Sequence, residues 1–235
     1  MRYQSLDILR GLAIIGMVLF HANYMLENIF MTEIFHDSTR FWYILGRVVA
    51  IVFISVSGVS LYLSLQHRAL YQIATRTRER FMILTTIALS ISLVTYIFFY
   101  EQRISFGIIH FFAIVTVLAL PFVRLGSWNM LVGTLCLIIG YMISPLSVDT
   151  DLLIPLGLTP LDYYSVDYYP IFPWFGYYLI WYGVASWLRR GGYLDTIFAG
   201  SYQVLRPLAY IGRHSLLIYV LHVPIIYGVI WMVWG

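Results

Sequence analysis

Three kinds of residue are scarce in this 235-residue chain: lysine is absent, cysteine occurs once, and charged side chains make up only 11% of the total. Without lysine, no Schiff base to retinal or pyridoxal phosphate can form, and no P-loop can exist. The single Cys136, inside an apolar run, excludes disulfide scaffolds and cysteine-based zinc sites. Because soluble domains carry about 25% charged residues, the low charge also excludes a water-soluble enzyme with one ordinary core.

Apolar residues make up 61% of the chain, and this share includes the aromatic residues, which make up 18% of the chain. This is the opposite of a disordered composition. Seven apolar segments approach the length of about twenty residues that crosses a bilayer. We therefore predict an all-α fold, a polytopic transmembrane bundle of about seven helices in which residues 1–235 form a single domain. The segments are 8–26, 44–65, 81–100, 104–123, 128–143, 171–188 and 215–234.

Arginine placement predicts the orientation, because basic residues concentrate on the cytoplasmic side of membrane proteins. With the N-terminus in the cytoplasm, only Arg40, Arg47 and Arg103 fall outside. Most acidic residues then lie on the outer side. We predict a cytoplasmic N-terminus and an outer C-terminus. The eleven arginines placed in the cytoplasm are Arg2, Arg10, Arg68, Arg76, Arg78, Arg80, Arg124, Arg189, Arg190, Arg206 and Arg213.

The first predicted helix carries three ionisable residues, Asp7, Arg10 and His21. Their spacings of three and eleven place them on one helix face. Ionisable groups at membrane depth are costly, so this face is a candidate functional surface that points into the bundle. A second interpretation is an Asp7–Arg10 pair near the cytoplasmic surface that only fixes the helix. His21 lies about 16 Å further along the axis, near the outer boundary.

Histidines and their polar neighbours recur in three other places. His36 lies in the loop after the first helix, where an imidazole can exchange a proton or attack an acyl group, or can simply be solvated. Arg103 and His110 are seven residues apart, two turns on one helix face. On the last helix, Ser215 and His222 are also seven apart, and interhelical hydrogen bonding would account for Ser215 as well. Because no pair shows metalloprotease spacing, we expect no metal site.

The connection after the second predicted helix is strongly basic, with Arg76, Arg78 and Arg80 close together. One interpretation is topology plus contact with anionic lipid. The other is a dock for an anionic cytosolic ligand such as a nucleotide or coenzyme A, since arginine binds two phosphate oxygens at once. On the outer side, the tyrosine-rich stretch 161–169 is typical of an interfacial aromatic belt, with sugar stacking as the alternative.

Four segments in order along the chain resemble the motifs of one family. The first, RYQSLDILRGLAIIGMVLFH, has an Asp, then Arg-Gly three residues on, then Met-Val. FISVSGVSLYLS places Phe-Ile ahead of Gly-x-Ser, and RISFGIIHFFAI is similar to Arg-Ile-x-x-Gly, then Val or Ile, then Leu or Ile, then Gln or His. GRHSLLIYVLH fits Gly-x-x-Ser-Leu-x-Ile-Tyr-x-x-His. Together they resemble the heparan-α-glucosaminide N-acetyltransferase family of the transmembrane acyltransferase superfamily, in a minimal, prokaryote-like version.

The resemblance implies a transmembrane acyltransferase that takes acetyl groups from cytosolic acetyl-CoA and places them on an extracytoplasmic amino sugar. It implies His36 as the catalytic residue, because the family's catalytic histidine lies in that loop. His21 stands where the family has Asn, and would assist by polarising the thioester carbonyl or sharing the proton. His110 stands where the family has Gln. The resemblance places Arg10, Arg103, Ser215 and His222 near the donor, and Asp7 would orient Arg10. We also predict His110 as a donor-binding residue, and Arg76, Arg78 and Arg80 as candidate contacts to its phosphates.

We therefore predict an acetyl-CoA-dependent membrane acyltransferase, acting on an amino or hydroxyl group of a sugar or glycoconjugate, in a prokaryotic plasma membrane. Membrane lipid is an expected partner, nucleic acid is not, and a homodimer is left open. The alternative is a small proton- or solute-conducting transporter in which Arg10, His21, His110 and His222 line a path. A non-catalytic membrane scaffold is a third interpretation.

Overall fold

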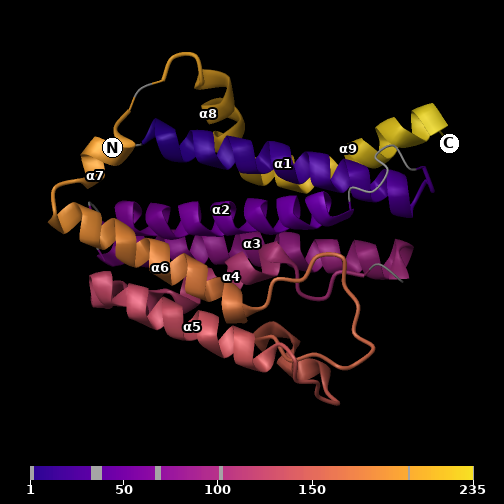
Figure 1. The fold of residues 1–235 in the computed structure, drawn as a ribbon, viewed down its shortest axis with the longest axis horizontal. Helices are drawn as coiled ribbons and strands as arrows, with labels where there is room; N and C mark the ends of the chain where they lie inside the picture. The colour runs from indigo at the N-terminus through magenta and orange to yellow at the C-terminus, as the bar shows by residue number, and fades with distance from the viewer. Residues whose placement is uncertain (1–2, 33–38, 67–69, 101–102, 201, 235) are drawn as a thin grey trace. The chain divides into compact units, whose positions relative to one another are not determined.

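The computed structural model describes residues 3–32, 39–66, 70–100, 103–200 and 202–234. Within these ranges the regular secondary structure is helical, apart from one isolated bridge between Ser147 and Thr159, and turns and irregular segments connect the helices. The predicted all-α fold is therefore confirmed for the described residues (Figure 1). The elements are α1 (Gln4–Asn28), α2 (Thr39–Leu65), α3 (Leu70–Phe98), α4 (Ile108–Leu118), η2 (Leu120–Trp128), α5 (Asn129–Ile143), η3 (Asp151–Leu156), α6 (Ile171–Arg190), α7 (Leu194–Phe198), α8 (Arg206–Arg213) and α9 (Ser215–Trp234).

Two compact units make up the chain. The first unit is Met1–Val56 with Gly191–Gly235, and the second is Ser57–Arg190. Helix α2 passes from the first unit into the second at residues 56–57. The organisation of residues 1–235 as a single domain stays a prediction.

Five helical segments in the described ranges are long and apolar enough to cross a membrane: Gln4–Asn28, Arg40–Leu65, Tyr71–Phe98, Leu120–Ile143 and Ser215–Val233. Helix α4 is apolar but has only 11 residues, which corresponds to about half the hydrocarbon thickness. Helix α6 covers the predicted segment 171–188 but is not among the five helices that are long and apolar enough to cross a membrane. The count of seven spans and the cytoplasmic N-terminus stay predictions.

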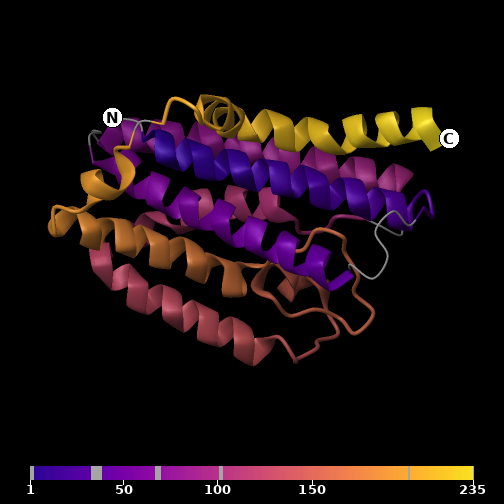
Figure 2. The ribbon, with the colours of Figure 1, turned by 45° about the horizontal axis from the view of Figure 1, so that its top comes forward.

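In the first unit, α1 packs closely against α8, and α9 runs alongside α1 in the same direction (Figures 1 and 2). Two glycines allow the contact with α8, because a Cβ on Gly11 would collide with the Leu208 carbonyl and one on Gly212 with the Asp7 carbonyl. The apolar side chains of α1, such as Ile14 at 2% exposed, fill the interior. This packing brings the start of the chain and its C-terminal helices together.

Side-chain hydrogen bonds fasten the first turn of α1. The Tyr3 hydroxyl donates to the Asp195 carboxylate, and the Ser5 hydroxyl donates to the Phe198 carbonyl oxygen at 2.7 Å. Gln4 and Tyr202 exchange two hydrogen bonds, of 2.9 and 3.1 Å. These bonds link α1 to the segment that carries α7, and so fix where the polar face of α1 begins.

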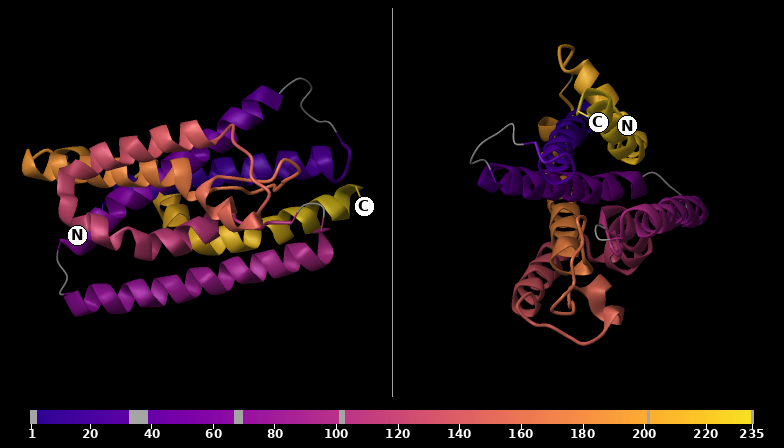
Figure 3. Two further views of the ribbon diagram at one scale, coloured as in Figure 1. Left: turned by 90° about the horizontal axis from the view of Figure 1, so that it is seen from below. Right: turned by 90° about the vertical axis from the view of Figure 1, so that its right-hand side faces the viewer.

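In the second unit, α5 and α6 form an antiparallel pair with very close backbones (Figure 3). A Cβ added to Gly176 would lie 2.6 Å from the Gly133 carbonyl oxygen, and the reverse contact is also 2.6 Å. Further along, Gly140 faces Pro173 and Gly183 faces Met130. Small residues at such contacts are typical of helix pairs in membranes, where close packing is a main source of stability.

Helix α3 differs from the sequence prediction, which placed residues 68–80 in a loop. The described part of that stretch is helical, because α3 begins at Leu70 and runs to Phe98. Leu, Gln, Ala, Glu and Arg dominate residues 70–80, and these are residues of good helix propensity. The arginines of this segment therefore project from a helix.

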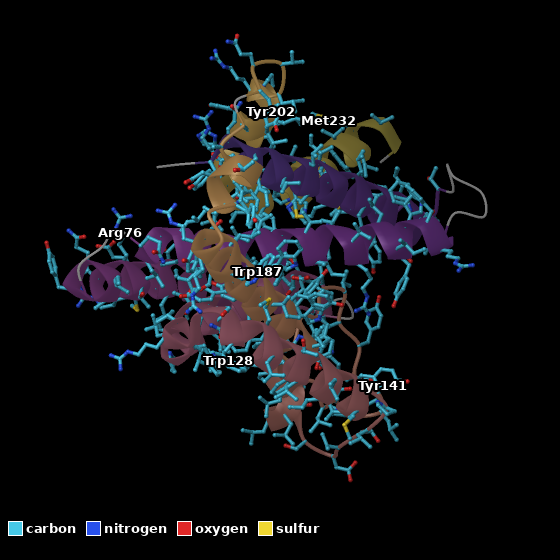
Figure 4. All side chains as sticks on the ribbon, turned by 60° about the vertical axis from the view of Figure 1, so that its left-hand side comes forward. Arg76, Trp128, Tyr141, Trp187, Tyr202 and Met232 are labelled. Atoms are coloured by element: carbon cyan, nitrogen blue, oxygen red, sulfur yellow. The ribbon has the colours of Figure 1, made fainter. Side chains whose placement is uncertain are left out.

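Exposed aromatic side chains mark the ends of α5. Trp128 and Tyr141, labelled in Figure 4, are 68% and 82% exposed, and they stand near opposite ends of the helix. Their separation of thirteen residues corresponds to about 20 Å along a helix. Aromatic residues at both boundaries are typical of a helix that lies in a bilayer.

Candidate functional site

The polar face predicted for the first helix is present on α1. Arg10 donates from Nη1 to the Asp7 Oδ1 atom at 2.7 Å, so the predicted Asp7–Arg10 ion pair is confirmed. The Asp7 side chain is almost wholly buried, whereas the Arg10 side chain keeps 20% exposure. Burial of the carboxylate holds the guanidinium at one place on the helix surface while leaving part of it accessible.

His21 lies on the same helix, and its ring contacts the ring of His222 from α9. The two ring centroids are 4.7 Å apart and the planes cross at 77°. The Nδ1 atom of His21 lies 2.9 Å from the Met17 carbonyl oxygen, and Nδ1 of His222 lies against the Tyr219 carbonyl oxygen. The packing of α1 on α9 therefore brings together two histidines that are 201 residues apart in sequence.

The α9 helix holds the other predicted residues of the closing motif. Ser215 begins the helix, and Tyr219 and His222 follow on the same face, as their spacing predicts. His222 is buried, at 5% exposed, and its Nε2 atom has no hydrogen-bond partner among the described residues. A buried nitrogen of this kind is costly unless a ligand, a substrate or a water supplies the partner.

In the second unit, His110 has hydrogen bonds at both ring nitrogens. The Gly107 amide donates to Nδ1 at 3.2 Å, which caps the start of α4. Nε2 lies 3.0 Å from the Ser92 hydroxyl, which itself donates to the Ile104 carbonyl oxygen at 2.6 Å. Nε2 of His110 is therefore the donor to Ser92. The sequence predicted His110 as a donor-binding residue, and the contacts it makes here join α3 to α4.

Arg103 does not share a helix with His110, contrary to the sequence prediction. It lies in the segment before α4, where its guanidinium stacks 4.8 Å above the Tyr100 ring. Helix α4 begins only at Ile108, whose amide donates to the Asp167 carboxylate at 3.1 Å. Since Asp167 and His110 both satisfy the first turn of α4, the helix has a fixed start after Arg103.

The basic residues Arg76, Arg78 and Arg80 are exposed along the first turns of α3. At 100° per residue, Arg76 and Arg80 share a face and Arg78 points away from it. Arg76 is labelled near this end of the helix in Figure 4. Two of the three arginines are thus placed to contact one anionic group together.

His36, the predicted catalytic residue, lies outside the described residues. The predicted residues that the structure does place fall into two sets. Asp7, Arg10, His21, Ser215 and His222 belong to the first unit, and Arg76, Arg78, Arg80, Arg103 and His110 belong to the second. No group of three or more His, Cys, Asp or Glu side chains that could hold a metal ion occurs in the described ranges.

Three polar residues that lie close to the predicted site residues or on the same helix were missed by the sequence prediction. Ser92 and Asp167 position His110 and α4. Asn23 is 4% exposed on α1, and its Oδ1 atom has no hydrogen-bond partner among the described residues. An Asn inside an apolar helix was a usable signal for Asn23. No local pattern could have pointed to Ser92 or Asp167, because their partners lie 18 and 59 residues away.

The long apolar helices and their polar faces are those of an integral membrane protein whose helices carry ionisable side chains. The family model for the catalytic region of heparan-alpha-glucosaminide N-acetyltransferase matches residues 2–224. The chain therefore belongs to this family of membrane acetyltransferases. No curated protein and no solved structure matches the chain.

Proposed function

We propose that this protein moves an acetyl group from cytosolic acetyl-CoA to an amino or hydroxyl group of an extracytoplasmic sugar, most simply an amino sugar. The observation that carries the proposal is the family membership over residues 2–224, joined to a polar helix face in the first unit. An apolar membrane helix has no structural need for an ion pair with a buried carboxylate or for a contact with a buried histidine, since both are costly there.

Arg10 is the proposed anchor for the donor. Coenzyme A carries phosphates, and a guanidinium with a partly exposed face can bind two oxygens of one phosphate. Asp7 orients Arg10 through the 2.7 Å contact. His222 contacts His21 of α1, and Ser215 lies seven residues earlier on α9; both are proposed to position the acyl end of the donor.

The second unit supplies further proposed donor contacts. Arg76, Arg78 and Arg80 are exposed on α3 and are suited to the phosphates of the nucleotide part. Arg103 is proposed to contact the donor directly, while His110 contributes through its hydrogen bonds at the start of α4. His36 is the proposed general base or transient acyl carrier, and His21 assists it.

Binding of acetyl-CoA to the purified protein tests this proposal. Thermal unfolding is measured with and without acetyl-CoA, in the wild type, in Arg10→Ala and in Arg206→Ala, which removes an exposed arginine of the same unit. We expect saturable stabilisation, about 2.7 kcal/mol at a hundredfold excess over Kd. Arg10→Ala should weaken it and Arg206→Ala should not. A folded wild-type protein that acetyl-CoA does not stabilise would contradict the proposal.

A further inference from the structure

The hydrogen bonds of His21 and His222 fix where each ring carries its proton. A carbonyl oxygen can only accept a hydrogen bond, so a ring nitrogen that faces one must be the N–H. In His21 this nitrogen is Nδ1, which lies 2.9 Å from the Met17 carbonyl oxygen. In His222 it is again Nδ1, which faces the Tyr219 carbonyl oxygen. In both neutral rings, Nε2 is therefore the atom with the free lone pair.

This arrangement separates two roles that a histidine can have beside a thioester. Polarising a carbonyl requires a hydrogen-bond donor, and the one N–H of each neutral ring already serves a backbone carbonyl. Accepting a proton requires a lone pair, which each Nε2 offers. The Nε2 atom of His222 is buried and has no partner among the described residues. The Nε2 atoms of the pair are therefore suited to accept a proton and not to donate one.

The surroundings of the pair allow it to hold one proton at a time. The rings are in contact, with centroids 4.7 Å apart, so a charge on one opposes a charge on the other. Phe20 packs on His21 at 5.2 Å, and Tyr219, the other titratable group against His222, lies at 5.4 Å. Along α1, the charged groups of the same face are Asp7 and Arg10, whose ion pair is about 16 Å away by helical rise.

We propose that His21 and His222 act as a single proton-accepting unit for the acetyl transfer. This inference rests on the proposed function. When the acceptor nitrogen or oxygen attacks the thioester carbonyl, its bond to hydrogen breaks and a bond to the acetyl carbon forms. The proton moves to an Nε2 atom of the pair. The carbon–sulfur bond then breaks, and the proton passes to the coenzyme A sulfur, which leaves as the thiol.

The proposal reassigns His222 from a donor-positioning residue to a catalytic residue, and selects proton sharing for His21. His36 is then left to carry the acyl group or orient the acceptor. The contact between the two rings also limits the positive charge that the pair can carry. On acidification the two rings should take up one proton between them well before a second, and a pair that is already protonated cannot accept another. The transfer rate should fall toward acid pH for this reason.

Asparagine substitutions give the sharpest test, because the asparagine amide can keep the hydrogen bond made by Nδ1 while the basic Nε2 is lost. The variants are His21→Asn, His222→Asn and the double variant. His214→Asn is the matched control, since Nδ1 of His214 makes the same kind of bond, 2.9 Å to the Tyr210 carbonyl oxygen, on an exposed ring. Single-turnover transfer from radiolabelled acetyl-CoA to glucosamine is measured from pH 5 to 9, roughly the range in which imidazole titrates.

General-base catalysis contributes about 10²- to 10⁴-fold, so each single variant should lose that much in rate. The double variant should lose no more than the worse single, because the two residues act as one unit. His214→Asn should match the wild type. Equal stabilisation of every variant by acetyl-CoA would show that the donor site is intact. A His222→Asn rate close to the wild type, or a double variant whose loss is the product of the single losses, would overturn the proposal.

Nitrogen NMR of protein labelled at histidine supplies a readout besides activity. In the wild type, the proposal expects the Nε2 signals of His21 and His222 to be of the unprotonated kind at neutral pH, and to change together on acidification. In His21→Asn, the His222 signal should titrate alone. Independent titration of the two rings in the wild type would contradict the pairing. If the wild type binds acetyl-CoA but acetylates no acceptor, the proposed function fails, whatever the NMR shows.

Discussion

His110 of the second unit and His222 of the first unit differ in what surrounds their ring nitrogens. In the second unit, both nitrogens of His110 are hydrogen-bonded to protein groups, one to the Gly107 amide and one to the Ser92 hydroxyl. In the first unit, Nδ1 of His222 faces a backbone carbonyl and Nε2 has no partner among the described residues. Family motifs cover both positions, so the motif alone does not separate their roles.

The difference teaches how a structural histidine can be distinguished from a reactive one. A buried polar group that is fully hydrogen-bonded contributes to stability, and its removal leaves its partners unsatisfied. A buried nitrogen without a partner costs stability and is retained when function requires it. By this criterion, His110 is a structural residue at the start of α4, and His222 is the histidine that we propose to take part in the chemistry.

The largest expected effect concerns the close packing of α5 on α6 in the second unit. Gly176→Leu places a side chain against the Gly133 carbonyl oxygen, 2.6 Å from the first added carbon. Overpacking against backbone forces α5 and α6 apart, so we expect a loss of about 3 kcal/mol or more in the free energy of unfolding. Gly228→Leu is the matched control, because nothing lies within 4 Å of its added Cβ. Thermal unfolding in detergent measures both. Equal melting temperatures for Gly176→Leu and Gly228→Leu would contradict the view that close α5–α6 packing stabilises the second unit.

A smaller effect is expected from the satisfied histidine. His110→Ala removes the bonds to Gly107 and Ser92, and leaves both groups with an unmet partner. We expect a loss of about 1–3 kcal/mol in the free energy of unfolding. Ser92→Ala should lose part of the same energy, so the double variant should be less than additive. Strict additivity would show that the Ser92–His110 contact contributes nothing to stability.

The smallest effect concerns the loop between α5 and α6. The Tyr168 hydroxyl donates to the Ile154 carbonyl oxygen at 2.8 Å, and burial raises the pKa of Tyr168 above its ordinary value of 10. Stability from this group is present below pH 10 and is lost as the pH rises, because the unfolded chain ionises first. Tyr168→Phe should cost about 1 kcal/mol at neutral pH and flatten the alkaline decline. If Tyr168→Phe loses stability at alkaline pH as the wild type does, other tyrosines cause that loss.

Much of the fold follows from patterns that are local in sequence. The apolar runs predict α1, α2, α5 and α9, and the spacing of three predicts the Asp7–Arg10 pair, because these depend only on neighbouring residues. The contact between His21 and His222 could not be predicted in this way. It depends on α1 packing against α9, which no periodicity in either helix specifies.

Two local predictions were wrong for physical reasons that sequence spacing does not contain. Arg103 and His110 were expected on one helix, but Asp167, 59 residues beyond Ile108, fixes the start of α4 after Arg103. The described residues of the basic stretch were expected in a loop, but α3 includes them because polar helix formers fill residues 70–80. Spacing suggested one helix in the first case and charge suggested a boundary in the second, and long-range hydrogen bonding and helix propensity decided otherwise.

The most direct test of the central claim is transfer across a sealed membrane. Purified protein is reconstituted in liposomes with glucosamine inside and acetyl-labelled acetyl-CoA outside. Protein in the orientation that exposes the donor side should place label on the enclosed glucosamine, while His222→Asn should place almost none and His214→Asn should match the wild type. Passage of unmodified glucosamine or protons through a folded protein, with no labelled product, would contradict the account and identify a transporter instead.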